Sequence, residues 1–460
     1  MHNTPTLTSC VLHKTPITPP VAVAAQGIYF DLEDGRRIMD GVGGAAVACI
    51  GSAHPVVVEA IREQAGKVNF TFHTQLTTEP AETLAKILID DSKGAFAYVG
   101  FVAGGTEAME AAMKTARQYF YETGQTQRSN FIGRKVSYHG ASLGTLGVAS
   151  NAARRAPYEC ILDQKTFHHV SPAYARRHQA GDETEEEYVE RLRSELEAKF
   201  IELGPDTVIA FVAETVSGAS SGVVPPPKGY FKAMKAVCDK YGALLILDEI
   251  MCGMGRVGTL HAWETYGDGV SPDIQAVAKG LGGGYTPMGA ILLTQKVAEG
   301  MRAKAGVWQH GYTYQAHPLC CAASVAVQRV IKQEGLLANI TTQGALLGDL
   351  LRSRLLRVGS TVAPYVYDIR GRGGFWAVEF DVTASPALDF GGKRLGFLVE
   401  ARCFQKNLMI MGMFGGANLD GTLGDHCMFA PAYNITSEEI ARIVDIFVES
   451  VEEVIAEGRV

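Results

Sequence analysis

Residues 243–250 read ALLILDEI, and residues 274–284 read IQAVAKGLGGG. Each stretch opens with a short, mainly apolar run and then turns abruptly to charged residues or glycine. Runs that are apolar at nearly every position are typical of strands buried on both faces, as in a parallel sheet. Asp248 and Lys279 then fall at strand ends, on the edge where open α/β sheets bind ligands.

The same alternation of short apolar runs and amphipathic segments extends over much of the chain. Further apolar runs fill residues 97–102, 132–138, 208–214 and 290–294. Between them lie helical patterns such as residues 107–121, whose alanines share one face. Strands alternating with helices predict an α/β fold with a mainly parallel central sheet.

A chain of 460 residues exceeds what one hydrophobic core usually serves, so two domains are expected. The alternation changes near residue 330, after which a mixed pattern leads to a final helix over residues 437–457. We therefore predict a large ligand-binding domain over residues 60–325 and a smaller α/β domain over residues 326–460. Residues 1–59 are predicted to join the smaller domain.

Composition excludes several kinds of partner. The formal net charge is −7, whereas nucleic acids and anionic membranes require clustered Lys and Arg. No stretch approaches the roughly 20 apolar residues that span a bilayer, and the polar, proline-rich N-terminus lacks the pattern of a secretory signal. Nine scattered cysteines without a CxxC pair favour a reducing compartment, so a cytoplasmic location is predicted.

Charged residues at the two strand ends are the first candidates for chemistry. A carboxylate such as Asp248 or Glu249 is costly to bury unpaired, so it is expected to have a cationic partner. A helix cap or a surface charge would explain the same residues. Lys279 precedes a glycine run, where a ligand can approach the backbone, and partial shielding from water would favour its neutral, nucleophilic amine. A solvated surface lysine is the alternative.

A third feature is the segment VAGGTEAMEAAMKTAR, residues 102–117. Gly105 and Thr106 follow a predicted strand and open a helix, whose free N–H groups and dipole form an anion site. Thr106 adds a hydroxyl donor to that site. The same residues fit a plain glycine turn with Thr106 as the helix N-cap, and both interpretations can hold together.

Together with YHGASLG at residues 138–144, these features resemble the class III aminotransferases, a branch of the fold-type I pyridoxal 5′-phosphate (PLP) enzymes. The resemblance covers nearly the whole chain and keeps its motifs in order. The other matching segments are AHPVVVEAI, LDEIMCGMGRVG, AKGLGGGYTPMGA, HGYTYQAHPLCCAA and FAPAYNITSEEI. It implies transfer of an amino group from an amine or ω-amino acid to a keto acid or aldehyde, by a ping-pong mechanism.

The resemblance also implies roles for individual residues, of which Lys279, Asp248 and Tyr138 would be catalytic. Lys279 would form the Schiff base with PLP and shuttle a proton, while Asp248 would keep the ring nitrogen protonated. Thr313 would reach the phosphate of the neighbouring subunit, which implies a homodimer. The other implied contacts are ring stacking by Tyr138 and Ile250, phosphate binding by Gly105 and Thr106, and an acid, Glu214, near the cofactor O3′. His139 lies beside Tyr138 in the sequence and is expected to provide a supporting hydrogen bond.

Other classes of protein share parts of this pattern. Residues 253–258 read GMGRVG, a literal GxGxxG, but loop-forming residues follow where a dinucleotide-binding helix would begin. No histidine spacing suits a metal site, and no GxSxG elbow marks a hydrolase. Aminomutases, racemases, decarboxylases and lyases of the same family would use the same cofactor residues. A non-catalytic PLP-binding scaffold is a further alternative, although Lys279 and Asp248 are both in place.

Two departures from the family's pattern concern the substrate. Many relatives carry a carboxylate-binding arginine near the C-terminus, but no arginine occurs here between Arg402 and Arg442. Arg154 and Arg256 remain as candidates for that contact. The small residues of 41–55, GVGGAAVACIGSAHP, and the Met-rich stretch 409–431 favour a roomy, flexible pocket for a bulky or long-chain amine.

Overall fold

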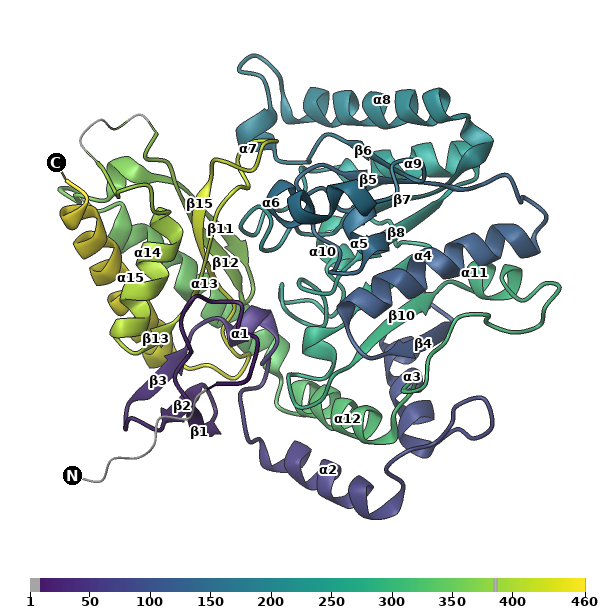
Figure 1. The fold of residues 1–460 in the computed structure, drawn as a ribbon, viewed down its shortest axis with the longest axis horizontal. Coiled ribbons are helices and arrows are strands. Elements are labelled where there is room, and N and C mark those ends of the chain that lie inside the picture. The colour runs from purple at the N-terminus through teal and green to yellow at the C-terminus, as the bar shows by residue number, and fades with distance from the viewer. Residues whose placement is uncertain (1–8, 384, 386–387, 460) are drawn as a thin grey trace.

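The stretches ALLILDEI and IQAVAKGLGGG supply neighbouring strands at the centre of a seven-stranded sheet (Figure 1). The computed structural model describes residues 9–383, 385 and 388–459. The order across the sheet is β4 (Tyr98–Val102), β10 (Gly289–Leu293), β9 (Ile274–Val277), β8 (Leu244–Asp248), β7 (Val208–Glu214), β5 (Asn130–Arg134) and β6 (Phe167–Val170). Strand β10 runs antiparallel to both its neighbours, and the other pairs are parallel.

Helices cover both faces of this sheet, because its central strands are apolar on both faces. Leu244 and Ile246 share a core with α4 (Gly105–Glu122), whereas Leu245 and Leu247 share one with α8 (Glu185–Leu203) and α9 (Tyr230–Tyr241). This confirms the predicted α/β fold with a mainly parallel sheet. The other helices of this large lobe are α2 (Pro55–Lys67), α3 (Glu79–Asp91), α5 (Leu143–Val148), α6 (Ala152–Arg155), α7 (Ala175–His178), α10 (Trp263–Tyr266), α11 (Gln295–Gly300) and α12 (Pro318–Gln333).

A smaller lobe, on the left in Figure 1, is built on two four-stranded sheets. One sheet is antiparallel, in the order β11 (Val366–Arg372), β12 (Phe375–Phe380), β15 (Asp425–Phe429) and β14 (Met411–Met413). The other has the order β1 (Ala22–Gln26), β2 (Tyr29–Leu32), β3 (Arg37–Asp40) and β13 (Leu408–Met409). Packed with them are α13 (Leu336–Leu355), α14 (Leu395–Gln405) and α15 (Ser437–Glu457).

The N-terminal segment and the C-terminal part of the chain meet in this smaller lobe. Strand β3 pairs in parallel with β13, with Met39 opposite Leu408. The helix predicted over residues 437–457 is confirmed as α15. Helix α12 crosses residue 326 and contacts α2 and α3 as well as α13, so the domain limits at residues 59 and 325 stay a prediction.

The strand predicted over residues 132–138 ends early, at Arg134. Val136 has a φ of 55°, in the left-handed region that β-branched residues avoid, and this turn ends the pairing. The Ser137 hydroxyl stabilises the turn by donating to the Arg134 carbonyl over 2.7 Å. Tyr138 and His139 therefore lie in a loop beyond the strand, where their side chains are free to face the end of the sheet.

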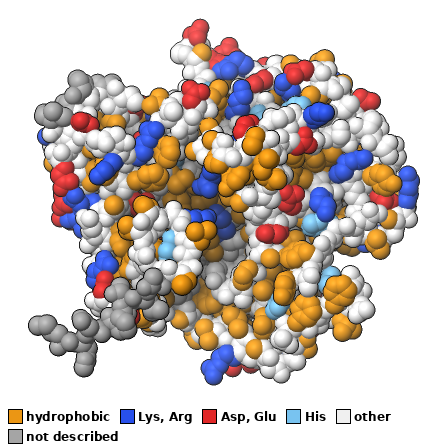
Figure 2. All heavy atoms as spheres, in the orientation of Figure 1, with side chains coloured by type: hydrophobic (Ala, Val, Ile, Leu, Met, Phe, Trp, Pro, Cys, Tyr) orange, Lys and Arg blue, Asp and Glu red, His pale blue; other side chains and the backbone are white. Residues whose placement is uncertain are grey.

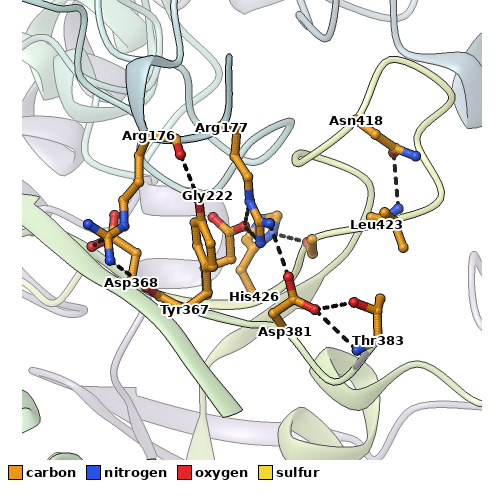
Figure 3. Close-up of polar contacts among 12 residues, drawn as sticks. Arg176, Arg177, Gly222, Tyr367, Asp368, Asp381, Thr383, Asn418, Leu423 and His426 are labelled. Atoms are coloured by element: carbon orange, nitrogen blue, oxygen red, sulfur yellow. Dashed lines mark hydrogen bonds and ion pairs between the residues drawn. The ribbon is translucent and has the colours of Figure 1, made fainter. Parts of the chain in front are cut away.

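A largely buried network of charges joins the two lobes, and we call Tyr174, Arg177, Arg370, Glu379 and Asp381 the Glu379 network. Figure 3 shows its contact between Arg177 and Asp381. The Glu379 carboxylate accepts from Arg177 Nη2 and Arg370 Nη1, both at 2.6 Å, and from the Tyr174 hydroxyl. Arg177 also reaches Asp381 over 3.0 Å. Burial raises the pKa of Glu379, but the Arg370 guanidinium and its other partners lower it overall. The small-lobe sheet is thereby fastened to α7 of the large lobe.

Candidate active site

A cavity of about 770 Å³ opens between the two lobes, at the carboxyl ends of β7, β8 and β9. Figure 2 shows this face of the molecule hollowed between the lobes. The lining residues predicted from the sequence are Gly105, Thr106, Tyr138, His139, Glu214, Asp248, Ile250 and Lys279. Lys14, Phe397 and Glu400 also line it and were not predicted, because the segments that carry them hold no recognisable motif.

Lys279 lies directly after β9, in a strained backbone conformation with a φ of 42°. The Gly282 and Gly283 N–H groups donate to its carbonyl over 3.2 and 2.9 Å, which holds the turn. Burial lowers the pKa of Lys279 to about 8, although the Asp248 and Glu214 carboxylates act in the opposite direction. Roughly a tenth of this amine is therefore neutral, and so nucleophilic, at pH 7, far more than for a lysine in water.

Asp248 is held in place by two hydrogen bonds. Its Oδ2 atom lies 2.8 Å from His139 Nδ1, and its Oδ1 accepts from the Ile250 N–H over 3.0 Å. Both Asp248 and His139 are buried, at 5% and 1% exposure. The supporting hydrogen bond expected for His139 is therefore present, and it fixes the carboxylate at the end of β8.

Glu249 lacks the cationic partner that was expected for a carboxylate at this edge, and for this residue the expectation is wrong. Its side chain is fully buried and accepts from neutral donors: the Thr215 hydroxyl, the Gln275 amide, and the N–H groups of Ala262 and Trp263, at 2.7 to 2.9 Å. Burial raises its pKa to about 7. Glu249 does not line the cavity; it ties the ends of β7 and β9 to the start of α10.

The start of α4 forms the other end of the cavity. Gly104 is the N-cap and offers no side-chain acceptor, so the N–H groups of the first turn remain open to a ligand. The alternative N-cap role for Thr106 is wrong, since Thr106 lies inside the helix and its hydroxyl accepts from the Ala141 N–H over 3.2 Å. A Cβ atom on Gly105 would lie 2.8 Å from Ile250 Cγ2. Glycine therefore lets the helix start approach the strand end closely.

Tyr138 and Glu214 complete the wall between these groups. The Tyr138 N–H donates to Glu214 Oε1 over 3.1 Å, and the Gly218 N–H donates to Oε2 over 2.9 Å. Burial raises the pKa of Glu214. On the solvent side, the Arg154 guanidinium lies over the Tyr138 ring, 4.6 Å from its centre.

Two predicted residues lie away from the cavity. Thr313 is in an exposed loop and does not line it. Arg256 is buried elsewhere: its Nη1 donates to the carbonyls of Gly374 and Pro431 at 3.1 and 2.6 Å. Arg256 therefore cannot contact a substrate in the cavity, and its prediction as a carboxylate-binding residue is wrong. Arg154 remains as the candidate for that contact.

The GxGxxG of residues 253–258 forms a turn, not the start of a helix. A Cβ atom on Gly255 would lie 2.6 Å from Leu337 Cδ2, and the backbone there has a φ of 97°. These glycines serve close packing against α13, so the turn is no dinucleotide site.

PLP carries an aldehyde, a ring nitrogen that works best protonated, and a dianionic phosphate. Each has its chemical complement in this cavity: an amine of lowered pKa, a fixed buried carboxylate, and an uncapped helix start. The cavity is also large enough to hold a substrate beside the cofactor. Fold and cavity thus define a PLP-dependent enzyme, and PLP is its cofactor.

Comparison with known proteins specifies the class further. The family description "Aminotransferase class-III" matches residues 13–451. An aminotransferase of Gibberella zeae is 44% identical over 94% of this chain and 84% of its own. Gamma aminobutyrate transaminase 3, chloroplastic, of Solanum lycopersicum is 30% identical over 94% of this chain and 80% of its own. The omega transaminase of Pseudomonas jessenii in complex with PMP superposes with a TM-score of 0.86, at 27% identity over 96% and 94% of the two chains.

The chain belongs to the class III aminotransferases. Its activity is PLP-dependent transamination, as the sequence predicted, and the other reaction types of the family are not favoured.

Proposed function

We propose that the donor of this aminotransferase is an ω-amine or ω-amino acid and that Lys279 is its catalytic base. When bound, PLP supplies the electron sink that makes the substrate's amine-bearing carbon acidic. The neutral Lys279 amine takes the proton from that carbon and later returns it, because its lowered pKa suits both directions. The observation that carries the role of Lys279 is the presence of this amine in one cavity with the His139–Asp248 pair.

In this proposal the remaining site residues bind and orient the cofactor. Asp248, fixed by His139, provides the negative charge that keeps a proton on the ring nitrogen. Gly105 and Thr106 hold the phosphate at the start of α4, and Tyr138 and Ile250 cover the ring. Glu214 positions the Tyr138 backbone.

We further propose that Arg154 holds the carboxylate of the keto-acid acceptor. Of the described residues that line the cavity, it is the one arginine. Its guanidinium is already placed by the Tyr138 ring, and guanidinium groups bind carboxylates with paired hydrogen bonds.

We propose that the site accommodates a bulky or long-chain donor, and a second cavity of about 640 Å³ supports this. Val47 lines both cavities, and the second is bordered by apolar side chains such as Phe30, Leu32 and Phe404. An apolar tail could therefore extend past Val47 into the N-terminal segment.

The donor class is tested by the first half-reaction alone. Purified holoenzyme is mixed with single amines and no keto acid, and the visible absorption of the lysine-bound cofactor is followed. We expect ω-amines to bleach the band and a keto acid to restore it. Donors are compared in pairs with and without a carboxylate. If removal of the donor's carboxylate abolished bleaching in every pair, ω-amines would be excluded as donors and only the ω-amino acid part of the proposal would stand.

We propose that the functional unit is a homodimer in which Thr313 reaches the neighbouring subunit's phosphate site. Exposed apolar side chains lie along residues 68–76, and one of them, Phe70, contacts Tyr314, the neighbour of Thr313 in the chain. We call Val68, Phe70, Phe72, Leu76 and Tyr314 the aromatic face. Phe70 and Tyr314 contact edge to face, with ring centres 5.9 Å apart. A contiguous apolar patch of this kind is typical of a protein interface.

Sedimentation analysis tests the dimer. We expect wild-type protein to have twice the mass of one chain, and Tyr314→Asp to be monomeric and inactive because it buries a charge at the interface. Tyr158→Asp is the control, since Tyr158 is also exposed but lies outside the aromatic face. A Tyr314→Asp protein that stays dimeric would exclude this face.

A cytoplasmic location is also proposed. The support is six buried thiols, which a reducing compartment keeps in that form: Cys49, Cys238, Cys252, Cys321, Cys403 and Cys427. In the part of the chain that the structure describes, no helix has the length and apolarity to cross a membrane.

A further inference from the structure

Glu400 is a carboxylate in the cavity wall that the proposed chemistry does not use. It lies on α14 of the small lobe, next to Phe397, Met411 and Met413, which line the same cavity. A Cβ atom on Gly412 would lie 3.0 Å from Glu400 Cβ, so the side chain packs closely against β14. The surroundings of this carboxylate are thus mainly apolar.

No cation compensates this carboxylate among the described residues. Its one recorded polar partner is the Gly412 N–H, and burial raises the pKa of Glu400 to about 7. The basic residues in the last turn of this helix and just after it pair with α15: Arg402 pairs with Glu453 and Glu457, and Lys406 pairs with Glu449 and Glu453.

A half-buried carboxylate with only one hydrogen-bond donor is costly in its charged form, so it either takes up a proton or pairs with a cation that a ligand supplies. In a mainly apolar substrate cavity, a few such polar groups decide which ligand binds. Three cations among the described residues line the cavity, and none of them compensates Glu400: Arg154 lies over Tyr138, Lys279 is the catalytic amine, and Lys14 is an exposed residue of the N-terminal segment.

We propose that Glu400 binds a second ammonium group at the far end of the amine donor, so that the preferred donor is an α,ω-diamine. This inference rests on the proposed function, because it concerns the half of the reaction that takes the amino group from the donor. One end of the diamine lies at Lys279, and the other pairs with Glu400 across the apolar wall. The acceptor's carboxylate uses Arg154, so donor and acceptor are distinguished by opposite charges in one cavity.

The test compares kcat/KM for a series of α,ω-diamines with that for monoamines of matched chain length. We expect wild-type enzyme to prefer one diamine length, and Glu400→Gln to lower the diamine-to-monoamine ratio by about 10- to 100-fold, mainly through KM. Glu400→Asp keeps the charge on a shorter stem and should shift the preferred chain length. Glu449→Gln is the control, because Glu449 lies on the surface and pairs with Lys406.

The outcomes separate this inference from the proposed function. If monoamines and ω-amino acids are turned over but the ratio is the same in wild type and Glu400→Gln, the role of Glu400 is refuted and the ω-amine donor class stands. If no amine bleaches the cofactor band in wild type, the proposed function itself fails. A change of the ratio in Glu449→Gln equal to that in Glu400→Gln would also refute the site.

Discussion

Replacement of Lys279 by alanine should reduce transamination by on the order of 10³-fold or more, because both the attacking amine and the proton shuttle are lost. Burial already disfavours the charged form of this side chain, so its removal should not destabilise the fold. Initial rates, together with circular dichroism and the thermal unfolding midpoint, check both statements. Lys296→Ala is the matched control, since Lys296 is an exposed lysine in the same lobe. Retained activity in Lys279→Ala would overturn its assignment as the catalytic lysine.

The lowered pKa gives a second readout that does not depend on turnover. In protein freed of cofactor, an amine-directed reagent should label Lys279 at a rate that rises as pH passes through about 8, whereas a lysine in water titrates near 10.4. The labelling rate rises with pH because only the neutral amine attacks the reagent, and burial makes that neutral form available at lower pH. Mass spectrometry identifies the labelled residue, and Lys279→Ala supplies the blank.

Asp248→Asn should lower kcat by about 10²- to 10³-fold, the usual cost of removing one charge or dipole that stabilises a transition state. Asparagine keeps the size of the side chain and can still accept the Ile250 N–H. Its amide nitrogen would replace the Oδ2 atom that faces His139 Nδ1, so the substitution removes the charge and also changes the His139 contact. Steady-state kinetics measures it, and an unchanged unfolding midpoint shows that the fold is retained.

The same substitution should move the pKa of Lys279 further down, because the Asp248 carboxylate raises it in the wild type. The labelling midpoint of cofactor-free Asp248→Asn should thus lie below that of wild type. If kcat fell without any such shift, the effect would stem from a structural change and not from the lost charge. If kcat were unchanged, the role assigned to Asp248 would be wrong.

Features set by local patterns were predictable from the sequence. The apolar run over residues 208–214 predicted β7, and the final helix predicted over residues 437–457 is α15. Asp248 and Lys279 were placed at strand ends because a buried strand cannot extend through a charged residue without a partner. Parallel pairing then brings those ends to one edge of the sheet, where the cavity lies.

Features set by distant contacts were not predictable in this way. Arg256 looks in the sequence like a possible carboxylate ligand, but the carbonyls that bind it belong to Gly374 and Pro431, more than a hundred residues away. Glu249 finds four neutral donors on three separate segments. Glu400 meets the cavity only because α14 packs against β14, and no local pattern around it indicates a ligand site.

The Glu379 network constrains how this enzyme could change over evolutionary time. Removal of Glu379 would leave the buried Arg370 guanidinium without its nearest carboxylate, at a cost of about 3–5 kcal/mol, so these two residues are exchanged most readily together. Sequence change at this contact is therefore slow, and the placement of one lobe on the other is conserved. Residues on the cavity rim, such as Phe397 and Met413, carry no charge and can vary singly. A lineage of such enzymes could then acquire new donors without rebuilding the frame that holds the cofactor.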